Sequence, residues 1–320
     1  MLERVRFLRL IGRRLVQLLP VVVLATVIVF GLIALVPGDP AITLAGENPT
    51  PQRIEEIRRL YGLDRPLVAQ YGSWLWRAAH GDLSKSLLSG ESTLRLIEQR
   101  LPMTLVLVVS GVFLSLLIGI PLGIAAAAGL RTRVDGIITA IASVGIAMPS
   151  FWLGMILVSA FALRWPVFPA TGAVSPFEDF GQSLYHAVLP ALALAAGGMA
   201  EVTRQVRSAF TEILSSHFVR TLQAKGLSPW RIYWQHGLKN IGVPLLTVSG
   251  LLFNRMLGAT VVIEAVFAIN GIGSLVVQAA INKDFPVVQG VVLLMVVMVT
   301  LVNLATDLLY AVVDPRVRNA

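Results

Sequence analysis

The sequence predicts an all-α, polytopic membrane protein with six transmembrane helices and a large external loop after the first helix. Its composition is the first observation: 56% of the 320 residues are hydrophobic and only 14% are charged, whereas soluble domains carry roughly 25% charged residues. The second is that six apolar stretches approach the roughly 20 residues that a helix needs to cross a bilayer core of about 30 Å. A soluble globule could not cover so many apolar side chains with so few charges.

The apolar stretches are the predicted membrane helices, at residues 15–36, 101–128, 137–163, 187–203, 241–267 and 287–311. The first should be retained as a membrane helix, because Val36-Pro37-Gly38 follows it where a signal peptide would carry a small-residue cleavage site. The fourth is the shortest and contains Pro190. Proline is tolerated in such helices because packed neighbours satisfy the backbone groups that it frees.

Four parts of the chain follow from this pattern. They are the cytoplasmic N-terminus with the first helix (1–36), the external loop (37–100), a five-helix core (101–311) that includes the cytoplasmic segment 204–240, and a cytoplasmic C-terminal tail (312–320). The chain should therefore cross the membrane an even number of times, with both termini on the same side.

Basic residues set the orientation. Fifteen of the 26 Lys and Arg lie in four segments, at residues 1–14, 129–136, 204–240 and 312–320. The short connections 164–186 and 268–286 hold only Arg164 and Lys283. Because short cytoplasmic loops are enriched in Lys and Arg, the first set is predicted to be cytoplasmic. The same distribution explains the net charge of +8 without a nucleic-acid partner.

The sequence lacks the motifs of common catalytic sites. It contains no cysteine, no G-x-x-x-x-G-K-[ST] phosphate loop, no H-E-x-x-H zinc motif and no G-x-S-x-G nucleophile motif. We therefore expect a membrane path without an enzyme site and without a cofactor or metal of its own. A membrane-embedded enzyme or a self-contained channel is the alternative from another class.

The external loop contains two predicted helical parts. Thr50-Pro51 is typical of a helix start, with threonine as the N-cap and proline at the first helical position. The stretch from Tyr71 to Trp76 is amphipathic, with Tyr71, Trp74 and Leu75 on one face. It predicts a helix that lies in the membrane interface. The alternative is a docking surface for an external protein.

The segment 204–240 predicts a cytoplasmic helix-turn-helix. A helix should continue out of the fourth span to Lys225 and end at Gly226, since glycine favours the left-handed conformation that ends helices. Ser228-Pro229 then starts a second helix, with serine as the cap, that runs to about Leu238. A helical pair this small has no core of its own, so its apolar face should be covered by another protein. Lipid headgroups at the interface are the alternative cover.

Six motifs follow one another along nearly the whole chain in the order of a known family. They are Val36-Pro37-Gly38-Asp39-Pro40, Tyr61-Gly62-Leu63-Asp64-Arg65-Pro66, Met148-Pro149-Ser150-Phe151-Trp152-Leu153-Gly154, Phe218-Val219-Arg220-Thr221 through Ala224-Lys225-Gly226-Leu227, Glu264-Ala265-Val266-Phe267 with Gly271-Ile272-Gly273, and Asp307-Leu308-Leu309-Tyr310. The chain resembles the B-type transmembrane permease subunit of ATP-binding-cassette importers of the dipeptide, oligopeptide and nickel class. Arg220-Thr221-Leu222 stands where the broader importer permeases have Glu-Ala-Ala, as in the peptide class generally.

The resemblance implies a type I importer fold in a bacterial inner membrane, and a heterodimer with a C-type permease. It also implies two cytosolic ATP-binding-cassette ATPase subunits, which bind ATP and Mg, and an extracytoplasmic solute-binding protein. The implied cargo is a di- or oligopeptide, and uptake of nickel or a metal chelate is the alternative. The residues implied in coupling to the ATPases are Arg220, Thr221, Ala224, Lys225, Gly226, Leu227, Ser228, Pro229 and His236.

Arg255 and Glu264 are the candidates for the translocation path or for contact with the partner permease. Arg255 lies near the centre of the fifth span, where a charge costs about 2.5–3.5 kcal/mol on insertion scales, so it should face protein or water. It could form an ion pair or carbonyl contact with the partner permease, or line the path of a peptide carboxylate. Glu264 lies about 13.5 Å further along the helix axis, too far for the two to pair.

Overall fold

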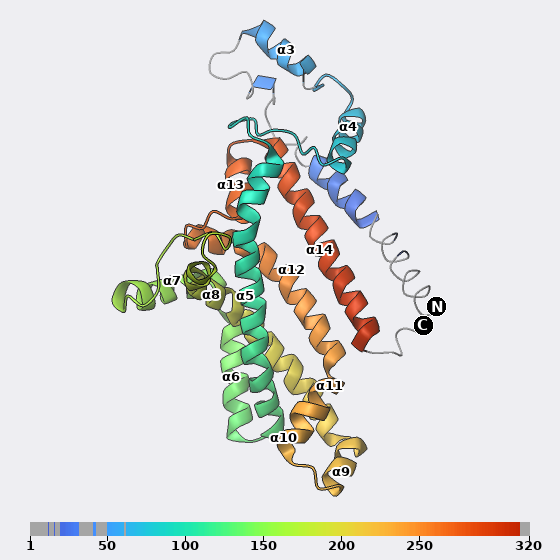
Figure 1. Ribbon diagram of the computed structural model, residues 1–320, viewed down its shortest axis with the longest axis vertical. Helices are drawn as coiled ribbons and strands as arrows, with labels where there is room; N and C mark the ends of the chain where they lie inside the picture. Colours follow the sequence, from blue (N-terminus) through green and yellow to red (C-terminus); the bar gives the residue numbers. More distant parts are fainter. Residues whose placement is uncertain are drawn as a thin grey trace. The chain divides into compact units, whose positions relative to one another are not determined.

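Helices form most of the described part of the protein (Figure 1). The computed structural model describes residues 12, 16, 20–31, 41–42, 50–60 and 62–313. Besides a helix over Pro20–Gly31, the elements are α3 (Pro51–Leu60), α4 (Leu67–Ala79), α5 (Thr93–Ala128), α6 (Arg133–Ala147), α7 (Ser150–Val158), η1 (Ser159–Arg164), α8 (Phe180–Ser215), α9 (His217–Ala224), α10 (Pro229–Arg231), η2 (Ile232–Gly237), α11 (Leu238–Asn240), α12 (Gly242–Val266), α13 (Ile272–Ile281) and α14 (Phe285–Val313). Among these residues the one isolated β-bridge joins Lys85 and Ser92.

Four of the described helices, α5, α8, α12 and α14, are long and apolar enough to cross a membrane. They contain the predicted spans 101–128, 187–203, 241–267 and 287–311 to within one residue at each end, which confirms these predictions. Of the first predicted span, 15–36, residues 20–31 are helical and most of the remainder lies outside the described residues. The C-terminal tail from residue 314 onward also lies outside them.

The third predicted span, 137–163, is not one continuous helix. It is divided into α6 and the α7–η1 pair, which are bent by 99° relative to each other and count as one crossing only if taken together. Met148 and Pro149 are extended, with ψ of 121° and 134°, because proline disfavours the helical conformation of the residue before it and lacks a donor of its own. Hydropathy does not register such a break, so the prediction of a single helix was wrong here.

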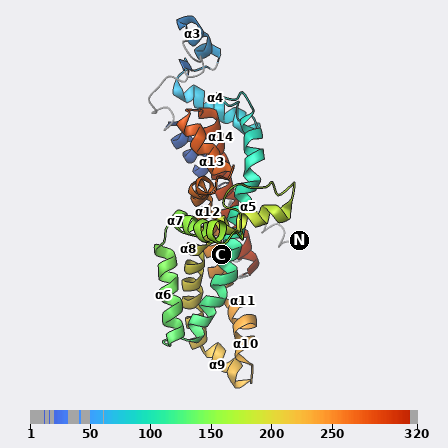
Figure 2. The same cartoon turned by 90° about the vertical axis from the view of Figure 1, so that its left-hand side faces the viewer.

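Helix α8 lies at the centre of one compact unit, which comprises residues 102–270 and 302–320. It packs against α6, α7, α12 and α9, and α6 runs alongside it in both views (Figures 1 and 2). In the most apolar 18-residue stretch of α8, 56% of the residues are buried, whereas the corresponding share in the other three long helices is 17–39%. Its weak hydropathy has a physical reason: protein covers more of this helix than of the others, so it needs fewer large apolar residues.

Glycines allow α5 to approach α8 closely. A Cβ atom at Gly119 would lie 2.7 Å from the Cβ of Val202, and one at Gly123 would lie 2.8 Å from the carbonyl oxygen of Thr203. On the α8 side, a Cβ at Gly198 would lie 2.4 Å from the hydroxyl of Ser115. This is the small-residue packing by which membrane helices gain van der Waals contact. Larger side chains at these positions would force the two backbones apart.

The other compact unit comprises residues 1–101 and 271–301. In it, Tyr71 of α4 lies against the 20–31 helix, with its ring centroid 5.5 Å from that of Phe30 and its hydroxyl 3.0 Å from that of Thr26. Trp74 is 5% exposed and also lies near Phe30. The predicted aromatic face of α4 therefore packs within the chain. It is not the free docking surface that the alternative required.

Helix α3 and the connection to α5 complete this unit. The Thr50 hydroxyl accepts a hydrogen bond from the Arg53 N–H at 3.3 Å, which confirms the predicted N-cap. Asp284, in the turn before α14, accepts from the Ser86 hydroxyl and from the Leu87 N–H at 3.0 Å. This carboxylate thus anchors the loop before α5. Helix α13 was not predicted, because its ten residues are too few for a membrane span.

Replacing Gly123 by alanine is expected to destabilise the α5–α8 contact by about 1–3 kcal/mol, as at other overpacked sites, since the new Cβ would clash with a backbone oxygen. The melting temperature of the detergent-solubilised protein measures this. Gly136→Ala is the matched control, because nothing lies within 4 Å of a Cβ there. Equal melting temperatures for the two variants would contradict the close packing.

Candidate functional site

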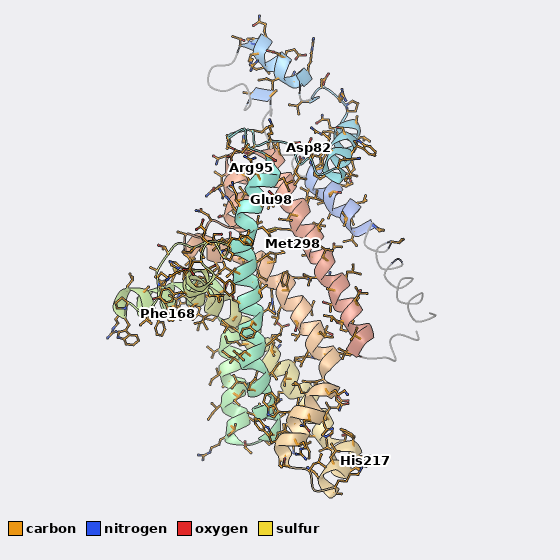
Figure 3. All side chains as sticks on the ribbon, in the orientation of Figure 1. Asp82, Arg95, Glu98, Phe168, His217 and Met298 are labelled. Atoms are coloured by element: carbon orange, nitrogen blue, oxygen red, sulfur yellow. The ribbon has the colours of Figure 1, made fainter. Side chains whose placement is uncertain are left out.

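The segment 204–240 begins as a continuation of α8. Helix α8 runs beyond the predicted span to Ser215, and α9 starts immediately afterwards at His217, labelled in Figure 3. Ser216 separates the two: its backbone is extended, with ψ of 153°, and its hydroxyl accepts from the Val219 N–H at 3.5 Å. The prediction of one continuous helix from Arg204 to Lys225 is therefore wrong, because the helix breaks at Ser216. The Ser216 hydroxyl caps the first turn of α9, where the backbone N–H groups have no acceptor within the helix.

Gly226 ends α9 as predicted. Its φ is +80°, in the left-handed region where residues with a Cβ are strained. The Gly226 N–H donates to the Gln223 carbonyl at 2.9 Å, and the Leu227 N–H donates to the Leu222 carbonyl at 3.2 Å. These two bonds are those of a Schellman motif. Nothing lies within 4 Å of a Cβ built at Gly226, so conformation alone selects glycine here.

The second helical run extends over residues 229–240 and is less regular than predicted. Pro229 occupies the first helical turn, but the Ser228 side chain makes no capping hydrogen bond, so that part of the prediction is wrong. The run then contains a π-helical turn, η2, before α11 completes it. Turns of this kind insert one extra residue per turn and are frequent at functional sites.

The short helices after Ser216 pack with their inner side against the end of α8. Phe210 of α8, Val219 of α9 and Ile232 of η2 are at most 2% exposed. Gly237 packs on Phe210 so closely that a Cβ there would lie 2.7 Å from the ring. Sequence analysis did not identify the contact between Phe210 and Gly237, because the two residues lie in different helices.

The outer surface of the pair carries most of the predicted coupling residues. Exposed ones are Arg220, Thr221, Ala224, Lys225, Gly226, Ser228 and Pro229, whereas Leu227 and His236 are partly buried. Trp230 is 71% exposed although large and apolar, and its ring lies 5.3 Å from that of Trp234. His236 lies 6.2 Å from the ring of Phe218, which is also exposed. This surface combines cationic and aromatic side chains in the way that protein interfaces do.

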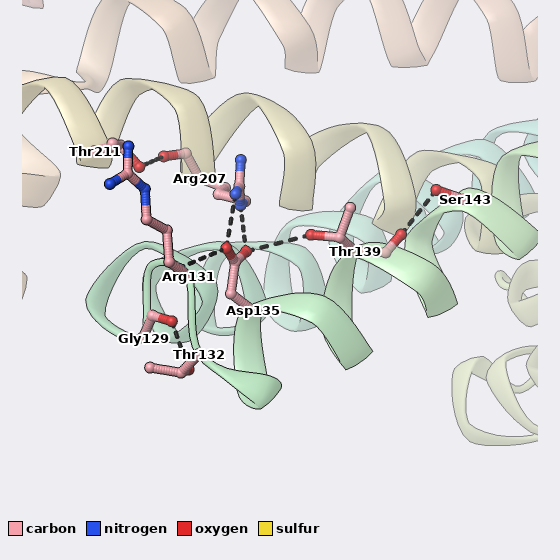
Figure 4. A network of polar contacts seen from close by, with 8 residues as sticks. All are labelled: Gly129, Arg131, Thr132, Asp135, Thr139, Ser143, Arg207 and Thr211. Atoms are coloured by element: carbon pink, nitrogen blue, oxygen red, sulfur yellow. Dashed lines mark hydrogen bonds and ion pairs between the residues drawn. The ribbon is translucent and has the colours of Figure 1, made fainter.

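A polar network joins the turn before α6 to α8, three residues before Phe210 (Figure 4). The Arg207 guanidinium binds both oxygens of Asp135, one of them at 2.8 Å. Asp135 also accepts from the Arg131 N–H at 3.1 Å and from the Thr139 hydroxyl at 3.3 Å. Bidentate pairs of this kind fix geometry as well as charge. The network brings together the segments 129–136 and 204–240, which were predicted to share one side of the membrane.

The two in-span candidates lie in different surroundings. Arg255 forms an ion pair with Glu201 of α8, and the side chains are 58% and 28% exposed. Glu264 is fully buried and accepts from the Thr104 hydroxyl of α5 at 2.6 Å. The two candidates are not brought together, as the helical spacing predicted. Sequence analysis did not identify Glu201 or Thr104 as their contacts, because pairing across helices leaves no periodic signal in the chain.

Within the described residues, no group of three or more His, Asp or Glu side chains is placed to hold a metal ion.

Comparison with known proteins decides the family. Residues 119–319 match the binding-protein-dependent transport system inner membrane components, and residues 7–108 match the N-terminal region described for such membrane components. This chain belongs to that family. The permease is 34% identical to the oligopeptide transport system permease protein AppB of Bacillus subtilis, over 95% of its own length and 98% of that protein. It is also 34% identical to the dipeptide transport system permease protein DppB of Escherichia coli, with 98% and 99% covered. The resemblance to B-type importer permeases is thereby confirmed.

The fold of the permease is likewise that of a solved relative. It superimposes on a chain of the inward-facing MetNI methionine ABC transporter with a TM-score of 0.57 at 19% identity, over 69% of this permease and 97% of that chain. At this identity the similarity concerns the fold alone. It confirms the predicted type I importer permease fold.

Gly226→Val is expected to destabilise the end of α9 by roughly 1–2 kcal/mol, because a β-branched residue is strained in the left-handed conformation. Hydrogen exchange of the amides from residue 217 to 231 should accelerate. Gly226→Asn is the control, since asparagine tolerates this conformation better and should exchange at nearly the wild-type rate. Unchanged exchange in the valine variant would show that the turn does not limit the stability of this segment.

Proposed function

We propose that this permease is a transmembrane subunit of an ATP-driven, binding-protein-dependent importer of di- and oligopeptides in a bacterial inner membrane. It forms the path with a C-type permease, and two cytosolic ATPase subunits bind ATP and Mg and supply the energy. The chain has no catalytic site of its own in this proposal. The names of AppB and DppB, both aligned over nearly their full length, support the peptide class.

The observation that carries the coupling role is the construction of the segment 204–240. Its inner face is fixed to α8 through Phe210 and Gly237, while its outer face leaves Trp230 71% exposed and carries Arg220 and Lys225. An exposed aromatic and cationic surface on a well-anchored helical pair suits contact with another protein. We infer that this surface fits a cleft of the ATPase subunit.

Helix α8 supplies the route from that contact to the membrane core. It is continuous over 36 residues, and one of its ends bears α9 while its middle packs on α5 and α12. A displacement of α9 by the ATPase would therefore move α8 as a body. Alternating access then follows from rearrangement of the helices around α8.

Orientation and the external partner rest on the charges of the connections. The ion pair of Asp135 and Arg207 joins two basic segments near one end of α8, and the positive-inside rule supports a cytoplasmic location for them and for both termini. In the loop predicted to be external, α3 carries exposed ion pairs such as Arg53–Glu56. Because Tyr71 and Trp74 pack internally, we propose α3 rather than the aromatic face of α4 as the contact for the solute-binding protein.

Ala224→Trp is expected to block assembly with the ATPase subunits while leaving the permease folded, because Ala224 is exposed at the end of α9. Co-purification of the ATPase with the permease, and peptide-stimulated ATP hydrolysis in proteoliposomes, measure the effect. Ala79→Trp, at an exposed position on the external helix α4, is the matched control and should retain both.

Normal ATPase co-purification and activity in Ala224→Trp would refute the coupling surface. The same proteoliposomes test the cargo: uptake of labelled di- or tripeptide supports the proposal, whereas uptake of a nickel chelate without peptide uptake would favour the alternative substrate.

A further inference from the structure

The ion pair between Arg255 and Glu201 is exposed on the surface of the chain, at a position in α12 that is predicted to lie within the membrane. Arg255 is the fourteenth of the 25 residues of α12, yet its side chain is 58% exposed even with its carboxylate partner in place. A guanidinium has five N–H donors, and one carboxylate cannot satisfy all of them. Lipid tails offer no acceptors, so an aqueous or polar environment must cover this surface.

Neutral hydrogen-bonding side chains also lie between α12 and α14. The Asn254 amide donates to the Asn303 side-chain oxygen at 2.8 Å, and the Tyr310 hydroxyl donates to the Thr247 hydroxyl at 2.8 Å. Asn303 is exposed, whereas Asn254, which directly precedes Arg255 in the chain, is partly buried. By contrast, Ala305, Leu309 and Val312 of α14 are exposed and apolar. Helix α14 thus has a polar face toward α12 and an apolar face suited to lipid.

We propose that Arg255 is a specificity-determining residue that binds the free carboxylate of a passing peptide, with Glu201 as its resting partner. This inference rests on the proposed function and adds the group that recognises the cargo. The substrate carboxylate replaces Glu201 at the guanidinium, and no covalent bond changes. Exposed ion pairs are weak, so a competing carboxylate can exchange with Glu201.

Cysteine labelling tests whether this surface is accessible to water, independently of the cargo. The chain contains no cysteine, and a side chain at Gly258, one turn from Arg255, would meet nothing within 4 Å. In the reconstituted complex with cysteine-free partner subunits, a membrane-impermeant methanethiosulfonate should modify Gly258→Cys and Asn303→Cys. Leu309→Cys, on the apolar face, is the control and should react at least about tenfold more slowly. Equal, slow reaction at all three positions would overturn the proposal and assign the surface to the partner permease or to lipid.

Competition between a tripeptide and its C-terminal amide tests the carboxylate contact. Arg255→Gln should lower the uptake ratio of acid to amide by about tenfold, the usual effect of losing a charge-assisted contact. Arg255→Lys should retain most of the ratio, and Arg133→Gln, at an exposed arginine that begins α6, should not change it. Any preference of the binding protein cancels, because all variants use the same one.

The two failures are distinguishable. If Arg255→Gln lowers the uptake of acid and amide equally, Arg255 has a structural role and the inference is wrong, although peptide import stands. If the wild-type complex takes up neither peptide, the proposed function itself fails. The labelling result still decides whether the surface around Arg255 is accessible to water.

Discussion

Close packing of α5 on α8 through glycine is the constraint on which the rest of the 102–270 unit depends. Gly119 and Gly123 bring the backbones so near that any Cβ would meet Val202 or a carbonyl oxygen. With this distance set, α8 can lie at the centre and accept α6, α7 and α12 around it. In a bilayer, where lipid tails are as apolar as the side chains, such van der Waals contact replaces the hydrophobic effect as the source of association.

The same helix connects the helical pair to the packed helices of the unit. Near one end of α8, Arg207 holds the turn before α6 through Asp135, and Phe210 supports η2 through Gly237. In its middle, Glu201 forms an ion pair with Arg255 on α12. The helical pair, the Asp135–Arg207 network and the exposed ion pair are thus all in contact with one helix. In the proposed importer, these contacts are the route by which ATP binding to a partner subunit acts on the membrane helices.

Local rules predicted much of this structure, and long-range contacts account for what they missed. The spans over α5, α12 and α14 follow from hydropathy, and the left-handed turn at Gly226 follows from the conformational freedom of glycine alone. The bend at Pro149 was missed because apolar composition continues through it. The contacts of Phe210, Glu201 and Thr104 were missed because each joins helices far apart in the chain. The family itself could be inferred from motifs, because each motif is a short stretch of sequence that can be recognised without knowing any contact between distant residues.

A spin-label distance measured through the transport cycle tests whether α8 and the helical pair move as one rigid body. Labels on Leu184→Cys of α8 and Gln235→Cys of η2, both exposed positions, report on the two ends of that body in a chain free of other cysteines. Rigid-body motion predicts the same distance distribution in the nucleotide-free and ATP-trapped complexes. A shift of the mean larger than the width of that distribution would contradict it, because the helical pair would then move separately from α8.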